Sequence, residues 1–199
     1  MTGSEPSLDE LRRARGEGWQ WPRAVTDTCP QCGYDAGSLA PEALGPRLVE
    51  LAASWRQFLV GADGTYLRTN PEPGVFSPLQ YGAHVRDLLR VYGDRIAIAV
   101  KEDNPSFPQF SPADDVWESY NRLGSEELAD DMGNQAERLA AILGDLGPDD
   151  WSRTLVRDGG KDGVYTFTVA GQARYAVHEA YHHLLDADGT LPTGGAAQN

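Results

Sequence analysis

Apolar side chains at helical spacing dominate the middle of the chain. Over residues 41–60 they recur three and four residues apart, at Leu44, Leu48, Leu51, Ala52, Trp55 and Leu59, which is the pattern of an amphipathic helix. The same period returns over residues 78–100 and 125–146, with Leu88 and Leu139 among the inward positions. These three segments are expected to be long helices with one face in a common core.

Residues with known roles at helix ends mark the limits of these segments. Ser77, Pro78 and Gln80 follow the order of an N-cap, a first-turn proline and a capping box. Gly147 and Pro148 are expected to end the third long helix. A shorter helix is expected over residues 114–120.

The last quarter of the chain predicts a hairpin and a fourth long helix. Residues 151–168 contain the turn-rich stretch RDGGKDG, followed by alternating β-branched and aromatic residues, which favours a long loop or a small hairpin. The fourth long helix is expected from about Thr168 to Asp186.

The expected fold is therefore all-α, a four-helix bundle with long connections. An irregular N-terminal segment over 1–40 precedes the bundle, which spans 41–188. Residues 189–199 are too small and polar to pack and are expected to form a flexible tail.

Composition excludes several classes of protein. Thirty acidic residues against seventeen basic ones give a net charge of −13, which repels the phosphates of nucleic acid and anionic membranes. Neither is an expected partner. No apolar run approaches the roughly 20 residues of a membrane span, and the start MTGSEPSLDELRR lacks the order of a signal peptide. We expect a cytoplasmic protein.

All four histidines lie in two of the expected helices. His84 is near the start of the second, and His178, His182 and His183 are in the fourth. Because His178 and His182 are four residues apart, both imidazoles can reach one metal ion. His84 lies one turn before Leu88, on the core side, and can supply a third ligand. Three imidazoles with an open fourth position are typical of a catalytic zinc-type site.

Other interpretations of these histidines remain open. They can be hydrogen-bonded interior residues beside a polar cavity. Residues 178–182 also spell the H-E-x-x-H of zinc metalloproteases, but no Glu follows and no His beyond His183, so the third ligand of those enzymes is missing. His183 is turned about 100° from His182, which favours a place behind the ligands or at the surface.

Cys29 and Cys32 are the only cysteines, which excludes a disulfide-stapled scaffold. The order Cys29-Pro-Gln-Cys32-Gly33 looks like half of a zinc ribbon, but a metal site there would need two unidentified ligands. The simplest interpretation is two reduced thiols in a turn. They can instead border the active site.

The sequence resembles the DinB/YfiT-like superfamily of metal-binding four-helix bundles. The matching elements are SPLQYGAHVRDLLRVYGDRI (77–96), TFTVAGQARYAVHEAYHHLLD (166–186) and TCPQCGYDAG (28–37), the last similar to the opening of many actinobacterial members. The resemblance implies that His84, His178 and His182 bind Zn²⁺ or Ni²⁺. It further implies transfer reactions with a low-molecular-weight thiol, as in the bacillithiol and mycothiol S-transferases and the related maleylpyruvate isomerases.

The expected activity is a metal-dependent, mycothiol-type S-transfer or thiol exchange in a natural-product or detoxification pathway. A thiol at the open position would lose its proton and attack an electrophilic small molecule. The residues expected to take part are Glu179, Tyr81 and Asp87 in catalysis and Arg86, Asp103 and Tyr181 in substrate binding. Two alternatives stay open: a hydrolase in which the metal activates water and Glu179 is the base, and a non-catalytic bundle in which the metal ties helices together. The expected partners include a second copy of the chain, in a homodimer.

Overall fold

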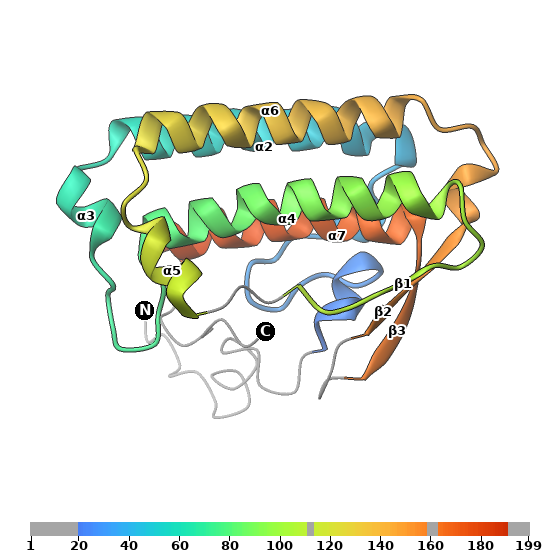
Figure 1. Cartoon of the computed structure of the whole chain (residues 1–199), viewed down its shortest axis with the longest axis horizontal. Helices are drawn as coiled ribbons and strands as arrows, with labels where there is room; N and C mark the ends of the chain where they lie inside the picture. Colours follow the sequence, from blue (N-terminus) through green and yellow to red (C-terminus); the bar gives the residue numbers. More distant parts are fainter. Residues whose placement is uncertain (1–19, 111–113, 159–162, 191–199) are drawn as a thin grey trace, which may run out of the picture.

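Four long helices form the body of the protein. The structure, a computed structural model, describes residues 20–110, 114–158 and 163–190. The long helices are α2 (Pro41–Gly61), α4 (Pro78–Ala99), α6 (Ser125–Gly144) and α7 (Val169–Ala187). Helices α2 and α6 lie side by side in one layer, and α4 and α7 in the other (Figure 1). Because α2 also contacts α7 and α6 contacts α4, the four helices enclose one core. The expected all-α four-helix bundle is confirmed.

The long helices begin and end close to the residues that the capping signals in the sequence predict. The Ser77 hydroxyl accepts a hydrogen bond from the backbone N–H of Gln80 at 3.2 Å, and the Gln80 side chain accepts one from the N–H of Ser77 at 2.9 Å. This capping box fixes the start of α4. The short helix α5 occupies Asp114–Tyr120 as expected, and α6 ends at Gly144, slightly before the expected limit.

A small sheet covers one end of the bundle (Figure 1). The expected hairpin is present as β2 (Thr154–Asp158) and β3 (Val164–Thr168), which pair antiparallel. Leu155 and Phe167 face each other across this ladder, and both side chains are buried. Two short elements were not expected: β1 (Ser106–Phe107), which pairs parallel with β2, and α3 (Gly64–Arg68).

Large side chains fill the core and join its layers. Trp55, Tyr92 and Tyr175 are among the largest fully buried side chains. The indole N–H of Trp55 on α2 donates a 2.8 Å hydrogen bond to the backbone carbonyl of Ala180 on α7, so the buried indole is satisfied. Among the described residues, no helix is long and apolar enough to cross a membrane.

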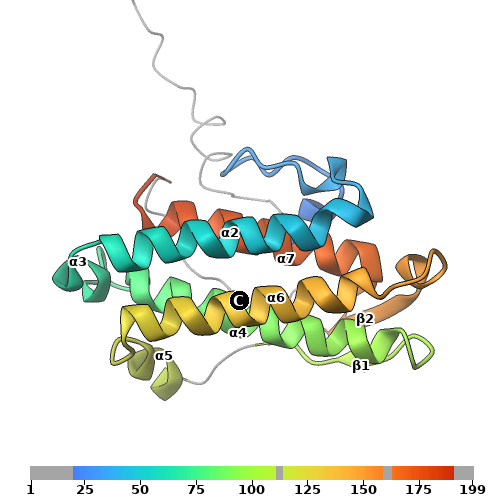
Figure 2. The ribbon, with the colours of Figure 1, turned by 90° about the horizontal axis from the view of Figure 1, so that it is seen from above.

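Residues 20–40, called the lead-in segment from here on, run along the outside of the bundle on the side formed by α2 and α7 (Figure 2). Its regular structure consists of two short 3-10 helices, Trp21–Val25 and Ala36–Ser38. Residues 1–19 of the expected irregular segment and 191–199 of the expected tail lie outside the described residues.

Candidate metal centres

Among the described residues, side chains able to bind a metal ion form two groups that meet on α7, and a third combination joins one histidine of each group, His182 and His183, to Asp186. In each group the potential ligand atoms lie within 4.8 Å of one another. The first, called the Cys–His group, consists of Cys29, Cys32, His178 and His182. The second, called the His–Glu group, consists of His84, Glu179 and His183. All of these side chains are buried except that of Cys32, which is half-buried.

Two overlapping pairs on α7 explain why there are two groups. His178 and His182 are four residues apart, and so are Glu179 and His183, so the members of each pair share a helix face. The two pairs are offset by one residue, which rotates one face about 100° from the other. The first pair faces the lead-in segment, and the second faces α4.

The structure therefore divides the expected ligand trio between the two groups. The rings of His84 and His183 lie 5.3 Å apart, whereas His178 and His182 lie beside the two cysteines. His183, expected behind the ligands or at the surface, is only 8% exposed and takes the place beside His84. The cause is the rotation of α7, which turns the His178 and His182 rings towards the lead-in segment.

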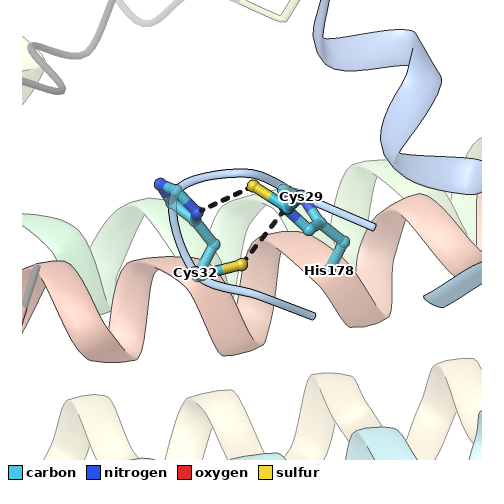
Figure 3. A group of neighbouring side chains, drawn as sticks. Cys29, Cys32 and His178 are labelled. Atoms are coloured by element: carbon cyan, nitrogen blue, oxygen red, sulfur yellow. Dashed lines mark hydrogen bonds between the residues drawn. The ribbon is translucent and has the colours of Figure 1, made fainter. Parts of the chain in front are cut away.

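The Cys–His group joins the lead-in segment to α7 (Figure 3). The Sγ atom of Cys32 lies 3.7 Å from Nε2 of His178, and Sγ of Cys29 lies 3.9 Å from Nδ1 of His182. Both cysteines are free thiols. A hydrogen bond from the Cys32 thiol lowers the pKa of the Cys29 thiol, and the two imidazoles reinforce this effect against the opposing effect of burial.

The His–Glu group lies between α4 and α7 among aromatic rings. His84 is 1% exposed, and its Nδ1 atom is buried with no hydrogen-bond partner among the described residues. Burial, with the nearby positive charge of His183, lowers the pKa of His84 to about 3. His84 is therefore a neutral imidazole at physiological pH, which is the form that binds a metal ion.

Aromatic side chains surround the two imidazoles of this group. Tyr81 stacks on His183 with ring centroids 5.3 Å apart. The ring of Trp117 on α5 lies 5.3 Å from that of His84, and the ring of Phe110 lies 6.0 Å from it. These rings make the surroundings of His84 and one face of His183 apolar, which strengthens electrostatic interactions inside the group.

Two carboxylates connect the groups. Glu179 lies 3.3 Å from Nδ1 of His178 and 3.6 Å from Nε2 of His183. Asp186 lies 2.8 Å from Nδ1 of His183 and 3.4 Å from Nε2 of His182. Burial opposes ionisation of Glu179, but its hydrogen bonds with His178 and His183 outweigh that effect and hold its pKa well below the usual range. Glu179 is therefore an anion.

Three of the other residues expected at the site lie near the His–Glu group. Tyr81 contacts it directly through His183. Asp87, one turn after His84 on α4, accepts a hydrogen bond from the Tyr120 hydroxyl. Arg86 lies beside it, with Nε 2.9 Å from the Asp87 carboxylate.

The remaining two expected residues lie elsewhere. Tyr181 stacks on Tyr34 of the lead-in segment at 4.4 Å between ring centroids, so it faces the Cys–His side of α7. Asp103 is exposed and follows the C-terminal end of α4. Since His84 lies near the other end, the helix separates the two by roughly 20 Å at 1.5 Å per residue. Asp103 is thus not part of either group.

The sequence did not predict that the cysteines lie beside His178 and His182, or that His183 lies beside His84, although both arrangements left a signal. The spacings Cys29-x₂-Cys32 and His178-x₃-His182 together match the Cys₂His₂ class of zinc site. In the structure the cysteine pair lies beside two of the three histidines expected to bind one ion. Glu179 and His183 are four residues apart, just as His178 and His182 are.

Comparisons with known proteins agree with this fold. A family model described as the DinB superfamily matches residues 47–187. Among solved structures, YfiT from Bacillus subtilis is similar, with a TM-score of 0.60 and 18% sequence identity over 76% of this chain and 87% of that chain. It is described as a probable metal-dependent hydrolase with an unusual four-helix bundle topology. No curated protein sequence matches the chain.

Proposed function

The chain belongs to the DinB superfamily, and we propose that it is a metal-dependent enzyme whose catalytic ion is held by His84, Glu179 and His183. The observation that carries this proposal is the buried imidazole of His84, whose Nδ1 atom has no hydrogen-bond partner among the described residues and whose ring is grouped with an ionised carboxylate and with His183, which has to release its proton before it can bind an ion. Leaving such an atom without a partner costs free energy, which binding of an ion offsets.

The donor set fits a divalent transition metal. Two imidazoles and one carboxylate occur in catalytic zinc sites, and the same set with open positions binds iron. Three protein ligands leave room for a substrate atom. An ion bound there supplies Lewis acidity, which lowers the pKa of a thiol or a water molecule that it binds.

The neighbouring side chains hold these ligands in place. Asp186 binds Nδ1 of His183 and so turns its Nε2 atom towards Glu179. His178 lies against one oxygen of Glu179, and His183 faces the other. Such outer partners fix the orientation of ligands and increase their basicity. The rings of Tyr81 and Trp117 pack against the imidazoles of His183 and His84.

We propose thiol S-transfer as the reaction, with a mycothiol-type thiol and an electrophilic small molecule as substrates. In this reaction the thiol releases its proton to solvent water, and its sulfur then bonds to the electrophilic carbon while the bond from that carbon to the leaving group, such as chloride, breaks and the leaving group departs with the electron pair. No separate general base is required from the protein. A reaction without a protein base suits this site, because both oxygens of Glu179 already face histidines.

Hydrolysis is the second candidate. The two-histidine, one-carboxylate donor set is shared with zinc peptidases, and YfiT is described as a probable metal-dependent hydrolase. Glu179 was the expected base for this reaction, but here it belongs to the ligand group. Hydrolysis would therefore rely on the ion alone to make a bound water molecule more acidic.

Incubation with mycothiol and a generic electrophile such as monochlorobimane tests the first candidate. The zinc- or nickel-loaded protein is expected to form the adduct faster than the metal-stripped protein and faster than the His84→Ala variant. An Arg56→Ala variant, changed at an exposed residue of α2, serves as the control and should retain the full rate. Equal rates for loaded and stripped protein would exclude S-transfer to this substrate class.

The same samples distinguish the alternatives. Metal- and His84-dependent hydrolysis of p-nitrophenyl acetate, without thiol adducts, would favour the hydrolase. Metal binding that depends on His84, with neither reaction accelerated, would favour a non-catalytic metal-binding bundle.

A further inference from the structure

We propose that Cys29, Cys32, His178 and His182 form a second and separate metal site, a closed four-coordinate zinc site that fastens the lead-in segment to α7. This site is distinct from the His–Glu group and does not depend on the proposed reaction. Its role is structural, because four protein ligands leave no position for a substrate.

The distances between the ligand atoms are close to those around a tetrahedral zinc ion. Zn–S bonds of about 2.3 Å and Zn–N bonds of about 2.0 Å at the tetrahedral angle place sulfur and nitrogen roughly 3.5 Å apart. The two sulfur–nitrogen pairs lie at 3.7 and 3.9 Å. All four potential ligand atoms lie within 4.8 Å of one another, which is close enough for them to share one ion.

The outer contacts of the two histidines follow the pattern of zinc-bound imidazoles. A ligating histidine usually donates its other ring N–H to a carboxylate or carbonyl. His178 turns Nε2 to Cys32 and Nδ1 to Glu179. His182 turns Nδ1 to Cys29 and Nε2 to Asp186. Each ring thus faces a thiol on one side and a carboxylate on the other.

The cysteine turn is shaped for the site by the backbone. The N–H of Cys29 donates to the carbonyl of Tyr34, and the N–H of Gly33 donates to the carbonyl of Cys29, both at 2.9 Å. Gly33 has a φ of 70°, a conformation that glycine adopts without strain. The turn therefore presents both sulfur atoms to α7 from one short loop.

Aromatic contacts position and shield the imidazoles. The ring of Trp21 lies 5.8 Å from that of His178 and 5.0 Å from that of His182. On the other side of the turn, Tyr34 stacks on Tyr181 and accepts a hydrogen bond from Arg47. These contacts place the ligands before an ion binds, which lowers the cost of ordering them.

The lead-in segment also needs a cross-link. Its two 3-10 helices are short, and its fully buried side chains are Ala24, Cys29 and Ala36, all of them small. Small side chains bury little apolar area. In structural zinc sites the free energy of metal binding becomes free energy of folding, and a thiolate–imidazole set selects zinc over magnesium or calcium.

Metal analysis of four proteins tests this site separately from the other one. The proteins are the wild type, Cys29→Ser/Cys32→Ser, His84→Ala and the control Thr28→Ala, which is changed at an exposed neighbour of the cysteine turn. After zinc loading and removal of excess metal, the cysteine variant is expected to hold one zinc ion per chain fewer than the control. His84→Ala is expected to keep that ion, so failure of either site is seen independently of the other.

Cobalt replacement gives a spectroscopic readout of the ligands. The wild type, Thr28→Ala and His84→Ala should show a thiolate-to-cobalt charge-transfer band in the near ultraviolet, and the cysteine variant should lack it. Limited proteolysis should cut within residues 20–40 sooner in the cysteine variant than in the control. Equal zinc content in the cysteine variant and the control, or a native disulfide between Cys29 and Cys32, would overturn the proposal.

Discussion

Asp186 contacts histidines of both groups, and its shorter contact is with His183. We expect Asp186→Asn to weaken metal binding at the His–Glu group by about 10- to 100-fold, since outer-shell carboxylates contribute that much to metal affinity. Titration against a competing chromogenic chelator measures the change. Asp188→Asn, at the exposed C-cap of α7, is the matched control. Equal affinities for the two variants would contradict the role assigned to Asp186.

Which histidine belongs to which group could not be predicted at the residue scale. Four-residue spacing holds for His178 and His182 and equally for Glu179 and His183. Helical periodicity shows which side chains share a face, but the direction of that face depends on how the helix is rotated against its neighbours. That rotation is set by contacts with distant parts of the chain, such as the hydrogen bond from Trp55 to Ala180.

Helix α4 carries His84 near a firmly capped start. The Ser77 side chain is fully buried. Its hydroxyl caps α4 by accepting a hydrogen bond from the N–H of Gln80, and it donates one to the side-chain oxygen of Asn121 at 2.6 Å. We expect Ser77→Ala to lower the free energy of unfolding by about 1 kcal/mol or more, because the cap is lost and a partly buried acceptor is left unpaired. Urea denaturation measures this. Ser54→Ala on the exposed face of α2 should change it by less than about 0.5 kcal/mol.

Replacement by alanine should change the free energy of unfolding differently at two glycines within the long helices. A methyl group added at Gly133 in α6 would meet no atom within 4 Å, whereas a Cβ at Gly45 in α2 would lie 3.3 Å from the Cα of Ala140. We expect Gly133→Ala to raise the free energy of unfolding by about 0.5–1 kcal/mol through helix propensity. Gly45→Ala should bring no such increase, because the added methyl group would crowd the contact between α2 and α6. Thermal unfolding of both variants, compared with the wild type, tests the difference; a larger gain at Gly45 would refute it.

At the scale of elements, the long helices and the hairpin could be predicted because each carries its signal locally. The apolar period and the Ser77 capping box mark α4 without reference to the rest of the chain. β1 could not be found in this way, because its two residues become a strand only by pairing with β2, far along the chain. α3 is too short for a helical period to be visible.

At the scale of the whole molecule, the two candidate centres are parts of one arrangement. The lead-in segment contacts α7 through the Cys–His group, and the histidines of that group contact Glu179 and Asp186. The same two carboxylates contact His183 in the His–Glu group. Binding of the lead-in segment to α7 therefore also fixes the carboxylates that orient the His–Glu ligands, so residues 20–40 support a site to which they contribute no ligand.

This arrangement predicts how strongly zinc stabilises the fold. A ligand that binds only the folded state at 100 times its dissociation constant adds about 2.7 kcal/mol to the free energy of unfolding for each site. We expect zinc to stabilise the wild type by more than it stabilises Cys29→Ser/Cys32→Ser, with a difference of about that size. Urea denaturation at fixed free zinc measures both gains.

Magnesium is the matched control for this experiment, because it prefers oxygen ligands and water to thiolates and imidazoles. It should leave the unfolding midpoints of both proteins unchanged. Binding of zinc to the cysteines of the unfolded chain would reduce the difference equally for the wild type and for Thr28→Ala, which keeps both thiols and should therefore show the same gain as the wild type. A zinc-dependent gain in the cysteine variant as large as in Thr28→Ala would show that the lead-in segment is held to α7 by packing alone.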